Sequence, residues 1–186
     1  MLKKFVVATV YIAGLSLVGP ISAAYADAPA LTEAQQTALN AQISAVEALV
    51  VQYQNDPDGL QAAIQSLVQN ASDPALAGTA VVSVFNNSTN PAIQKILANN
   101  AGIQAAGGQG LGAAIATIGI TNPDLATQMT AYVQTNAGST FVASVQSGSD
   151  TQTSSIQQQN NNNNNNNNNN DDLTNNSTPE TPASAS

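Results

Sequence analysis

Four Asx-proline pairs recur along the middle of the chain: Asp56-Pro57, Asp73-Pro74, Asn90-Pro91 and Asn122-Pro123. Asp and Asn side chains accept hydrogen bonds from the free N–H groups at a helix start, and proline is favoured at the first helical position. Hydrophobic residues follow each pair at intervals of three or four, which is the spacing of one helix face. The pairs therefore predict four short helices, each opened by an Asx cap.

The spacing of these pairs suggests a repeat. The first three pairs recur with a period of about 17 residues, and the fourth follows after nearly two further periods. We expect Gly107-Gly108 to make the turn where a start is missing. A fixed period predicts short helices packed as a small bundle or an irregular helical solenoid. The alternative is that four similar helices produce similar spacings by chance; both interpretations give an all-α fold.

A further helix is predicted from Thr32 to about Gln54. Thr32 is a good N-cap, and Gln35 completes a capping box with it. One apolar stripe then follows, formed by Leu39, Ile43, Val46, Val50 and Tyr53.

A β-sheet alternative rests on three segments rich in β-branched residues, namely 79–85, 115–120 and 140–145. The proline starts and the neighbouring alanines favour helix for all three.

The N-terminus has the pattern of a secretory signal peptide. Lys3 and Lys4 precede an apolar run, and Ala24-Tyr25-Ala26 matches a small-x-small cleavage site. We expect cleavage after Ala26 and export by the general secretory route to the periplasm or the outside of the cell; the alternative is that the segment persists as an anchor. The predicted organisation is a signal peptide at 1–26, a leader at 27–31, a helical domain at 32–148 and a disordered, acidic, Gln/Asn/Ser/Thr/Pro-rich tail at 149–186.

Composition removes several function classes. The chain has no His, Cys or Trp, and Lys95 is its only basic residue after Ala26, against eleven acids. One lysine cannot neutralise a run of phosphates, so we expect no nucleic acid partner. No disulfide can form, and no later apolar run is long enough to span a bilayer, so we expect no stable membrane insertion after cleavage. We expect no cofactor and no metal.

The glycine-rich segment 108–113 fits the loose dinucleotide pattern G-x-G-x-x-A, but it lacks a preceding strand and a suitably placed acid. A second interpretation fits better. Gly108, Gly112 and Ala116 lie four residues apart, so one helix face carries only small residues and allows a second helix to approach closely. We predict that this face packs within the domain, the alternative being an interaction face for another molecule.

Other motifs give only weak evidence for metal binding or catalysis. Asp56 to Gly59 resembles part of a calcium loop, but Gln54 and Gln65 occupy positions that require carboxylates. Glu47 flanks an apolar stripe and is predicted to be solvated, while the other acids of the domain are accounted for by helix starts. Lys95 is predicted to be a surface residue. The sequence therefore predicts no enzymatic activity.

The asparagine run from Asn160 to Asn170 is either a hydrated spacer or a self-associating segment, and we favour the spacer.

These features lead to three hypotheses. The first is an exported, non-enzymatic helical protein that acts by protein–protein or surface contact or by self-association, for example in an extracellular matrix or cell-envelope assembly. The second is a periplasmic chaperone-like or ligand-binding helical module, which requires an uncovered apolar groove. The third, which we favour least, is a carboxylate-based polysaccharide hydrolase with two acids converging in a cleft.

Overall fold

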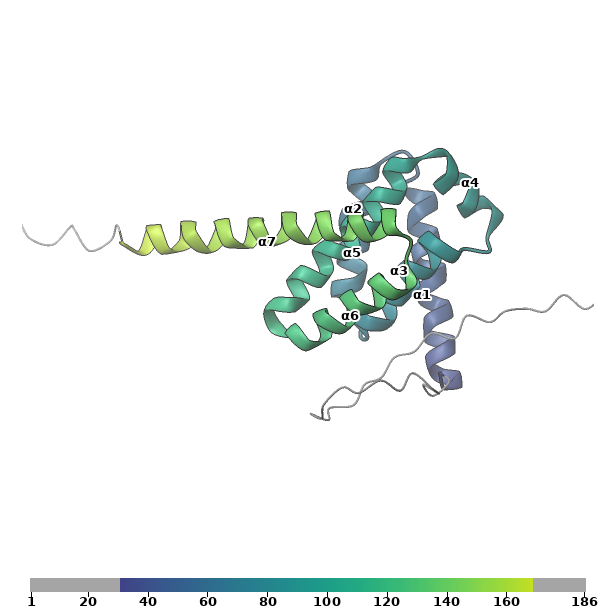
Figure 1. Ribbon diagram of the computed structural model, residues 1–186, viewed down its shortest axis with the longest axis horizontal. Helices are drawn as coiled ribbons and strands as arrows, with labels where there is room; N and C mark the ends of the chain where they lie inside the picture. Colours follow the sequence, from purple (N-terminus) through teal and green to yellow (C-terminus); the bar gives the residue numbers. More distant parts are fainter. Residues whose placement is uncertain (1–30, 169–186) are drawn as a thin grey trace, which may run out of the picture. The chain divides into compact units, whose positions relative to one another are not determined.

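The computed structural model describes residues 31–168 of the 186-residue chain as seven α-helices, with no strand in that range (Figure 1). The predicted all-α fold is confirmed, and the β-sheet alternative is wrong because all three of its segments lie in helices. The predicted signal peptide and residues 27–30 of the leader lie outside the described residues. The helices are α1 (Glu33–Gln52), α2 (Pro57–Gln69), α3 (Pro74–Asn87), α4 (Pro91–Asn99), α5 (Ala101–Thr121), α6 (Pro123–Asn136) and α7 (Ser139–Asn168).

Each predicted Asx-proline pair begins a helix, namely α2, α3, α4 and α6. The proline occupies the first turn, and the Asx side chain accepts a hydrogen bond from a backbone N–H of that turn. These bonds are 3.0 to 3.1 Å long and run from Gly59 to Asp56, from Leu76 to Asp73, from Ala92 to Asn90 and from Leu125 to Asn122.

The capping box of α1 is also confirmed. The Thr32 N–H donates to Gln35 Oε1 at 3.0 Å, and the Gln35 N–H donates to Thr32 Oγ1 at 3.2 Å. The predicted apolar stripe faces the core, with Leu39, Val46 and Val50 buried.

Helix α5 differs from the prediction. It runs without interruption from Ala101 to Thr121, so the turn expected at Gly107-Gly108 is wrong. The helix starts instead at Asn100, whose Oδ1 accepts a hydrogen bond from the Ile103 N–H at 3.2 Å, and no proline follows this cap. Helices α2, α3 and α4 start at evenly spaced prolines, but α5 starts at Ala101, outside that spacing. A regular repeat along the whole domain is therefore not shown.

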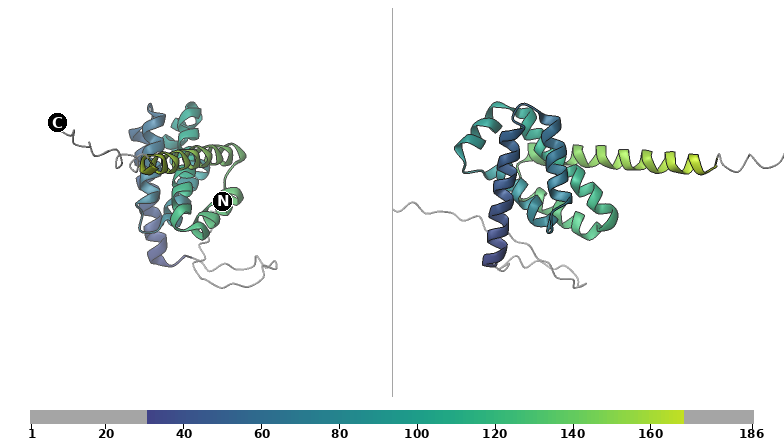
Figure 2. Two further views of the ribbon diagram at one scale, coloured as in Figure 1. Left: turned by 90° about the vertical axis from the view of Figure 1, so that its left-hand side faces the viewer. Right: turned by 180° about the vertical axis from the view of Figure 1, so that it is seen from behind.

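Helix α5 is the central element of the domain. It packs most extensively on α2 and also contacts α3, α4 and α6 (Figure 1). The view from behind in Figure 2 shows α1, in purple, as a long straight helix beside α2, and α1 also contacts α3 and α4. A Cβ at Gly110 would lie 2.5 Å from the carbonyl oxygen of Gln61, so glycine allows α5 to approach the backbone of α2. Glycines inside α5 therefore serve contacts between helices.

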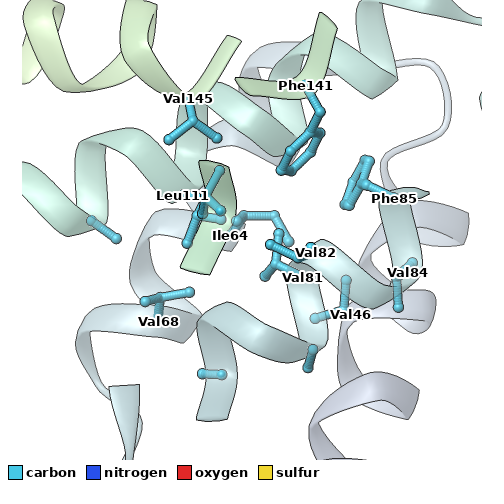
Figure 3. Packing of buried hydrophobic residues seen from close by; sticks show 14 of the residues in the cluster. Val46, Ile64, Val68, Val81, Val82, Val84, Phe85, Leu111, Phe141 and Val145 are labelled. Carbon is cyan, nitrogen blue, oxygen red and sulfur yellow. The ribbon is translucent and has the colours of Figure 1, made fainter. Parts of the chain in front are cut away.

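The core is made of aliphatic side chains from all seven helices and two phenylalanine rings. Phe85 of α3 and Phe141 of α7 stack with their ring centroids 5.6 Å apart and an angle of 30° between the planes (Figure 3). Leu111 of α5 and Val145 of α7 lie beside this pair, and both are buried. The first part of α7 is thus part of the same core as the preceding helices.

The structure differs from the predicted disordered tail. Helix α7 passes through the predicted boundary at Ser149 and continues to Asn168, while residues 169–186 lie outside the described range. The contact with α5 reaches the predicted boundary: Gly148 is buried, and a Cβ there would collide with the backbone of Gln109. The compact domain includes α7 up to Thr153, and residues from Ser154 onward form a separate unit. The tail prediction counted large apolar residues, but here a glycine makes the contact.

Candidate interaction site

The predicted small-residue face divides between two environments. Gly108 and Gly112 lie against α7. A Cβ at Gly108 would be 2.6 Å from Ser144 Cβ, and a Cβ at Gly112 would collide with the carbonyl oxygen of Val145. These two glycines therefore pack within the domain. Ala116, one turn further along α5, is only partly buried and lines a surface groove.

The groove lies between the C-terminal half of α5 and helix α6, and has a volume of about 390 Å³. Small side chains make up most of its wall, and none of its lining residues carries a charge. Helix α5 contributes Ile115, Ala116 and Gly119; α6 contributes Ala126, Thr127, Thr130, Ala131 and Gln134; and α7 contributes Ser149.

The threonine hydroxyls of the groove are already engaged with their own helix. Thr127 Oγ1 donates to the carbonyl oxygen of Pro123 at 2.9 Å, and Thr130 Oγ1 donates to that of Ala126 at 2.8 Å. Such bonds to the preceding turn use the donor of a hydroxyl group. The groove therefore offers methyl and methylene surface, with Gln134 as its main polar side chain.

An exposed isoleucine flanks the groove. Ile120 follows Gly119 in the chain and lies one helical turn after Ala116, on the same side of α5. With 61% of its surface exposed, it is the more exposed of two large hydrophobic residues that face solvent among the described residues, the other being Val51 at 48%. Ile120 therefore adds an exposed apolar side chain to the same side of α5 as Ala116.

Tyr132 connects α6 to α3 by a side-chain hydrogen bond. Its side chain is hydrogen-bonded to Thr79, which is buried on α3. Burial raises the pKa of the Tyr132 hydroxyl above its ordinary value of 10.0, and the hydrogen bond to Thr79 acts in the opposite direction. Sequence reasoning missed this pair because Thr79 lies in a run of apolar residues and nothing local marks its partner on α6.

The carboxylates occupy structural positions. Glu47 was predicted to be solvated, but it is partly buried and accepts hydrogen bonds from Asn90 Nδ2 at 3.0 Å and from Ser88 Oγ at 3.4 Å. It therefore joins α1 to the residues that open α4. Asp56, from the calcium-loop pattern, caps α2 through the Gly59 N–H. Lys95 is exposed, as predicted.

Within residues 31–168, no group of three His, Cys, Asp or Glu side chains is placed to hold a metal ion. None of the helices in this range combines the length and the apolar character needed to cross a bilayer. Comparison of the chain with models of protein families, with curated proteins and with solved structures finds no match.

Proposed function

We propose that this chain is an exported, non-enzymatic helical protein that acts by binding another protein through the groove between α5 and α6. The observation that carries the proposal is the uncharged, small-residue wall of this groove with exposed Ile120 at its edge. A wall of Ala, Gly and Thr lets an apolar helix or extended segment come close to the backbone. The signal-peptide pattern that ends at Ala26 supports export, and with it a place in an extracellular or cell-envelope assembly.

The charge of the chain supports an apolar rather than an ionic contact. The described residues contain seven acids and one lysine, and the two nearest acids in sequence, Asp124 and Asp150, precede or follow the lining residues without belonging to them. An uncharged patch on an acidic protein is the region where a partner meets the lowest electrostatic cost of desolvation.

Photo-crosslinking in the source cells tests the proposal. A photoreactive phenylalanine at Ala131, which is exposed and lines the groove, should give a defined protein adduct. The same photoreactive phenylalanine at exposed Ala98 of α4 is the matched control and should not give that adduct.

The substitution Ala131→Glu places a charge in the groove and should weaken partner binding by at least about tenfold, in line with the cost of an unpaired charge in an apolar contact. Ala98→Glu should leave the binding unchanged. Identical adducts at both positions, or equal affinities for the two glutamate variants, would contradict the proposal.

A second candidate function is the binding of a small apolar molecule, because the groove presents an uncharged and mostly apolar wall. A neutral dye such as Nile red should then bind one site per chain. Ala131→Glu should abolish this binding without affecting the unfolding midpoint. Dye binding that survives this substitution would argue against the groove as a ligand site.

A further inference from the structure

The described start of α7 buries two large side chains on the domain. Between Ser139 and Thr153, Phe141 and Val145 are the large residues that become buried, and Val142 packs at the edge of the core. Phe141 stacks on Phe85, and Val145 belongs to the same core cluster as Leu111 (Figure 3). Most of the other residues of this stretch are Ser, Thr, Gln, Gly or Asp.

The face beneath α7 has a specific shape. Phe85 provides the stacking partner, and Gly108 and Gly112 admit the backbone of the incoming helix. On the other side of the contact, Gly148 lets α7 approach the backbone of Gln109. The face therefore fits a helix that carries Phe, Val and Gly at spacings of four and three.

The connection between α6 and α7 is short. Only Ala137 and Gly138 separate α6 from α7, and Ala137 is extended, with φ −108° and ψ 154°. Side chains cap each of the helices α1 to α6, but the residue before α7 is Gly138, which has no side-chain oxygen. The Gly138 N–H donates to Asn86 Oδ1 at 2.9 Å. The sequence contains no cysteine, so no disulfide ties α7 to the other helices.

We propose that the face of α3 and α5 beneath α7 also accepts α7 from a second copy of the chain, so that two copies form a dimer by exchanging this helix. When α7 detaches, Phe141 and the face that held it become exposed together. A second copy covers both surfaces again, because its α7 carries the same Phe-Val-Gly spacing and its α3 and α5 present an identical face. Exchange of an identical element needs no new contacts beyond those of the closed chain. Of the residues that line the groove between α5 and α6, the exchange replaces Ser149, which would then come from the second copy. The inference does not rest on the proposed function.

Changing the length of the connection Ala137-Gly138, which is the hinge of the exchange, tests the proposal. Deleting Ala137 and Gly138 prevents α7 from folding back on its own domain, so the dimer fraction should rise at least tenfold over wild type in size-exclusion chromatography with light scattering. Inserting Gly-Ser-Gly-Ser after Ala137 eases folding back and should lower the dimer fraction at least tenfold. The matched control is the same insertion between Ser72 and Asp73, in the exposed turn between α2 and α3, which should leave the dimer fraction at the wild-type value.

Labelled chains show whether the dimer exchanges subunits. Mixing ¹⁵N-labelled and unlabelled wild-type protein at high concentration, followed by dilution, should give mixed dimers in native mass spectrometry. A wild type that stays monomeric at every concentration overturns the proposal. So does a dimer fraction that is the same in wild type and in the hinge-insertion variant, because a dimer formed through an ordinary surface does not depend on hinge length. If the deletion variant fails to fold, the dimer fraction of the insertion variant still tests the exchange. Failure here leaves the crosslinking test of the groove unaffected.

Discussion

Three glycines of α5 lie where no side chain fits. A Cβ at Gly107 would collide with the ring of Phe85, one at Gly110 with Gln61, and one at Gly112 with Val145. Each glycine costs roughly 1 kcal/mol of helix propensity relative to alanine. The domain accepts this cost because close approach buries more surface on both helices.

Two alanine substitutions in α5 separate these effects. Gly112→Ala should destabilise the protein by about 1 to 3 kcal/mol, because the new methyl group forces α5 and α7 apart. Gly119→Ala is the control on the same helix: its Cβ would meet only Ala126 Cβ, at 3.5 Å, which is an ordinary contact. It should stabilise the protein by up to about 1 kcal/mol through helix propensity. Urea unfolding followed by circular dichroism measures both, and equal effects would contradict the described packing.

Tyr132 gives the domain a dependence on alkaline pH. Because burial raises the pKa of its hydroxyl in the folded state, the unfolded chain loses that proton first as the pH rises. The contribution of Tyr132 to stability is therefore fully present below about pH 10, the unfolded-state pKa, and is lost as the pH rises through the higher folded-state pKa.

Tyr132→Phe should cost about 1 kcal/mol at neutral pH, because it removes the hydrogen bond to buried Thr79. It should also reduce the loss of stability as the pH rises above about 10. Urea midpoints measured at neutral pH and across this rise for wild type and variant check both effects. Parallel pH profiles for the two proteins would show that Tyr132 does not titrate differently in the folded state.

At the scale of elements, two single asparagines join consecutive helices. Asn100 lies between α4 and α5, and Asn122 lies between α5 and α6. Each ends one helix and caps the next, which leaves no residues for a loop. Asn100 has an additional task, because its Nδ2 donates to the carbonyl oxygen of Gln54 at 3.0 Å, in the segment between α1 and α2.

The two junctions should respond differently to alanine. Asn122→Ala removes one cap and should cost about 1 kcal/mol. Asn100→Ala removes a cap and the bond to Gln54, so it should cost about 2 kcal/mol. The free energies of unfolding from urea titration compare them directly. A smaller loss at Asn100 than at Asn122 would mean that the bond to Gln54 does not contribute.

For the molecule as a whole, export is the prediction with the clearest outcome. The pattern at Ala24-Tyr25-Ala26 predicts that the mature protein starts at Asp27. Intact mass and N-terminal sequencing of protein from the periplasm or the culture medium measure this directly. Substituting Ala24 and Ala26 with bulky residues should leave the precursor uncleaved. An uncleaved chain among the soluble cytosolic proteins would contradict the prediction.

The helix starts could be predicted because their determinants lie within three residues of one another. Thr32 with Gln35, and the Asx residue of each proline pair, form their capping bonds regardless of the rest of the fold. The start of α5 does not follow from the proline pattern, because Asn100 caps the helix without a following proline. The expected turn at Gly107 and Gly108 is wrong because both glycines lie inside this helix.

The candidate site could be predicted only in part. The spacing of Gly108, Gly112 and Ala116 places them on one face of a helix, but it cannot show that α7 covers the two glycines and leaves Ala116 at a groove. The prediction that Glu47 is solvated is wrong because its partners, Ser88 and Asn90, lie more than forty residues away along the chain. Nothing near Glu47 in the sequence indicates them.

The sequence alone determined where most helices begin, which stripe of α1 faces inward, and which reactive side chains the protein lacks. These properties depend on composition and on hydrogen bonds between near neighbours. The tertiary structure decided which glycines lie inside helices, which part of α7 packs on α5, and which apolar surface stays open on α5 and α6. A glycine inside a helix and a turn glycine look the same in sequence, because what distinguishes them is a backbone brought into contact from a distant part of the chain.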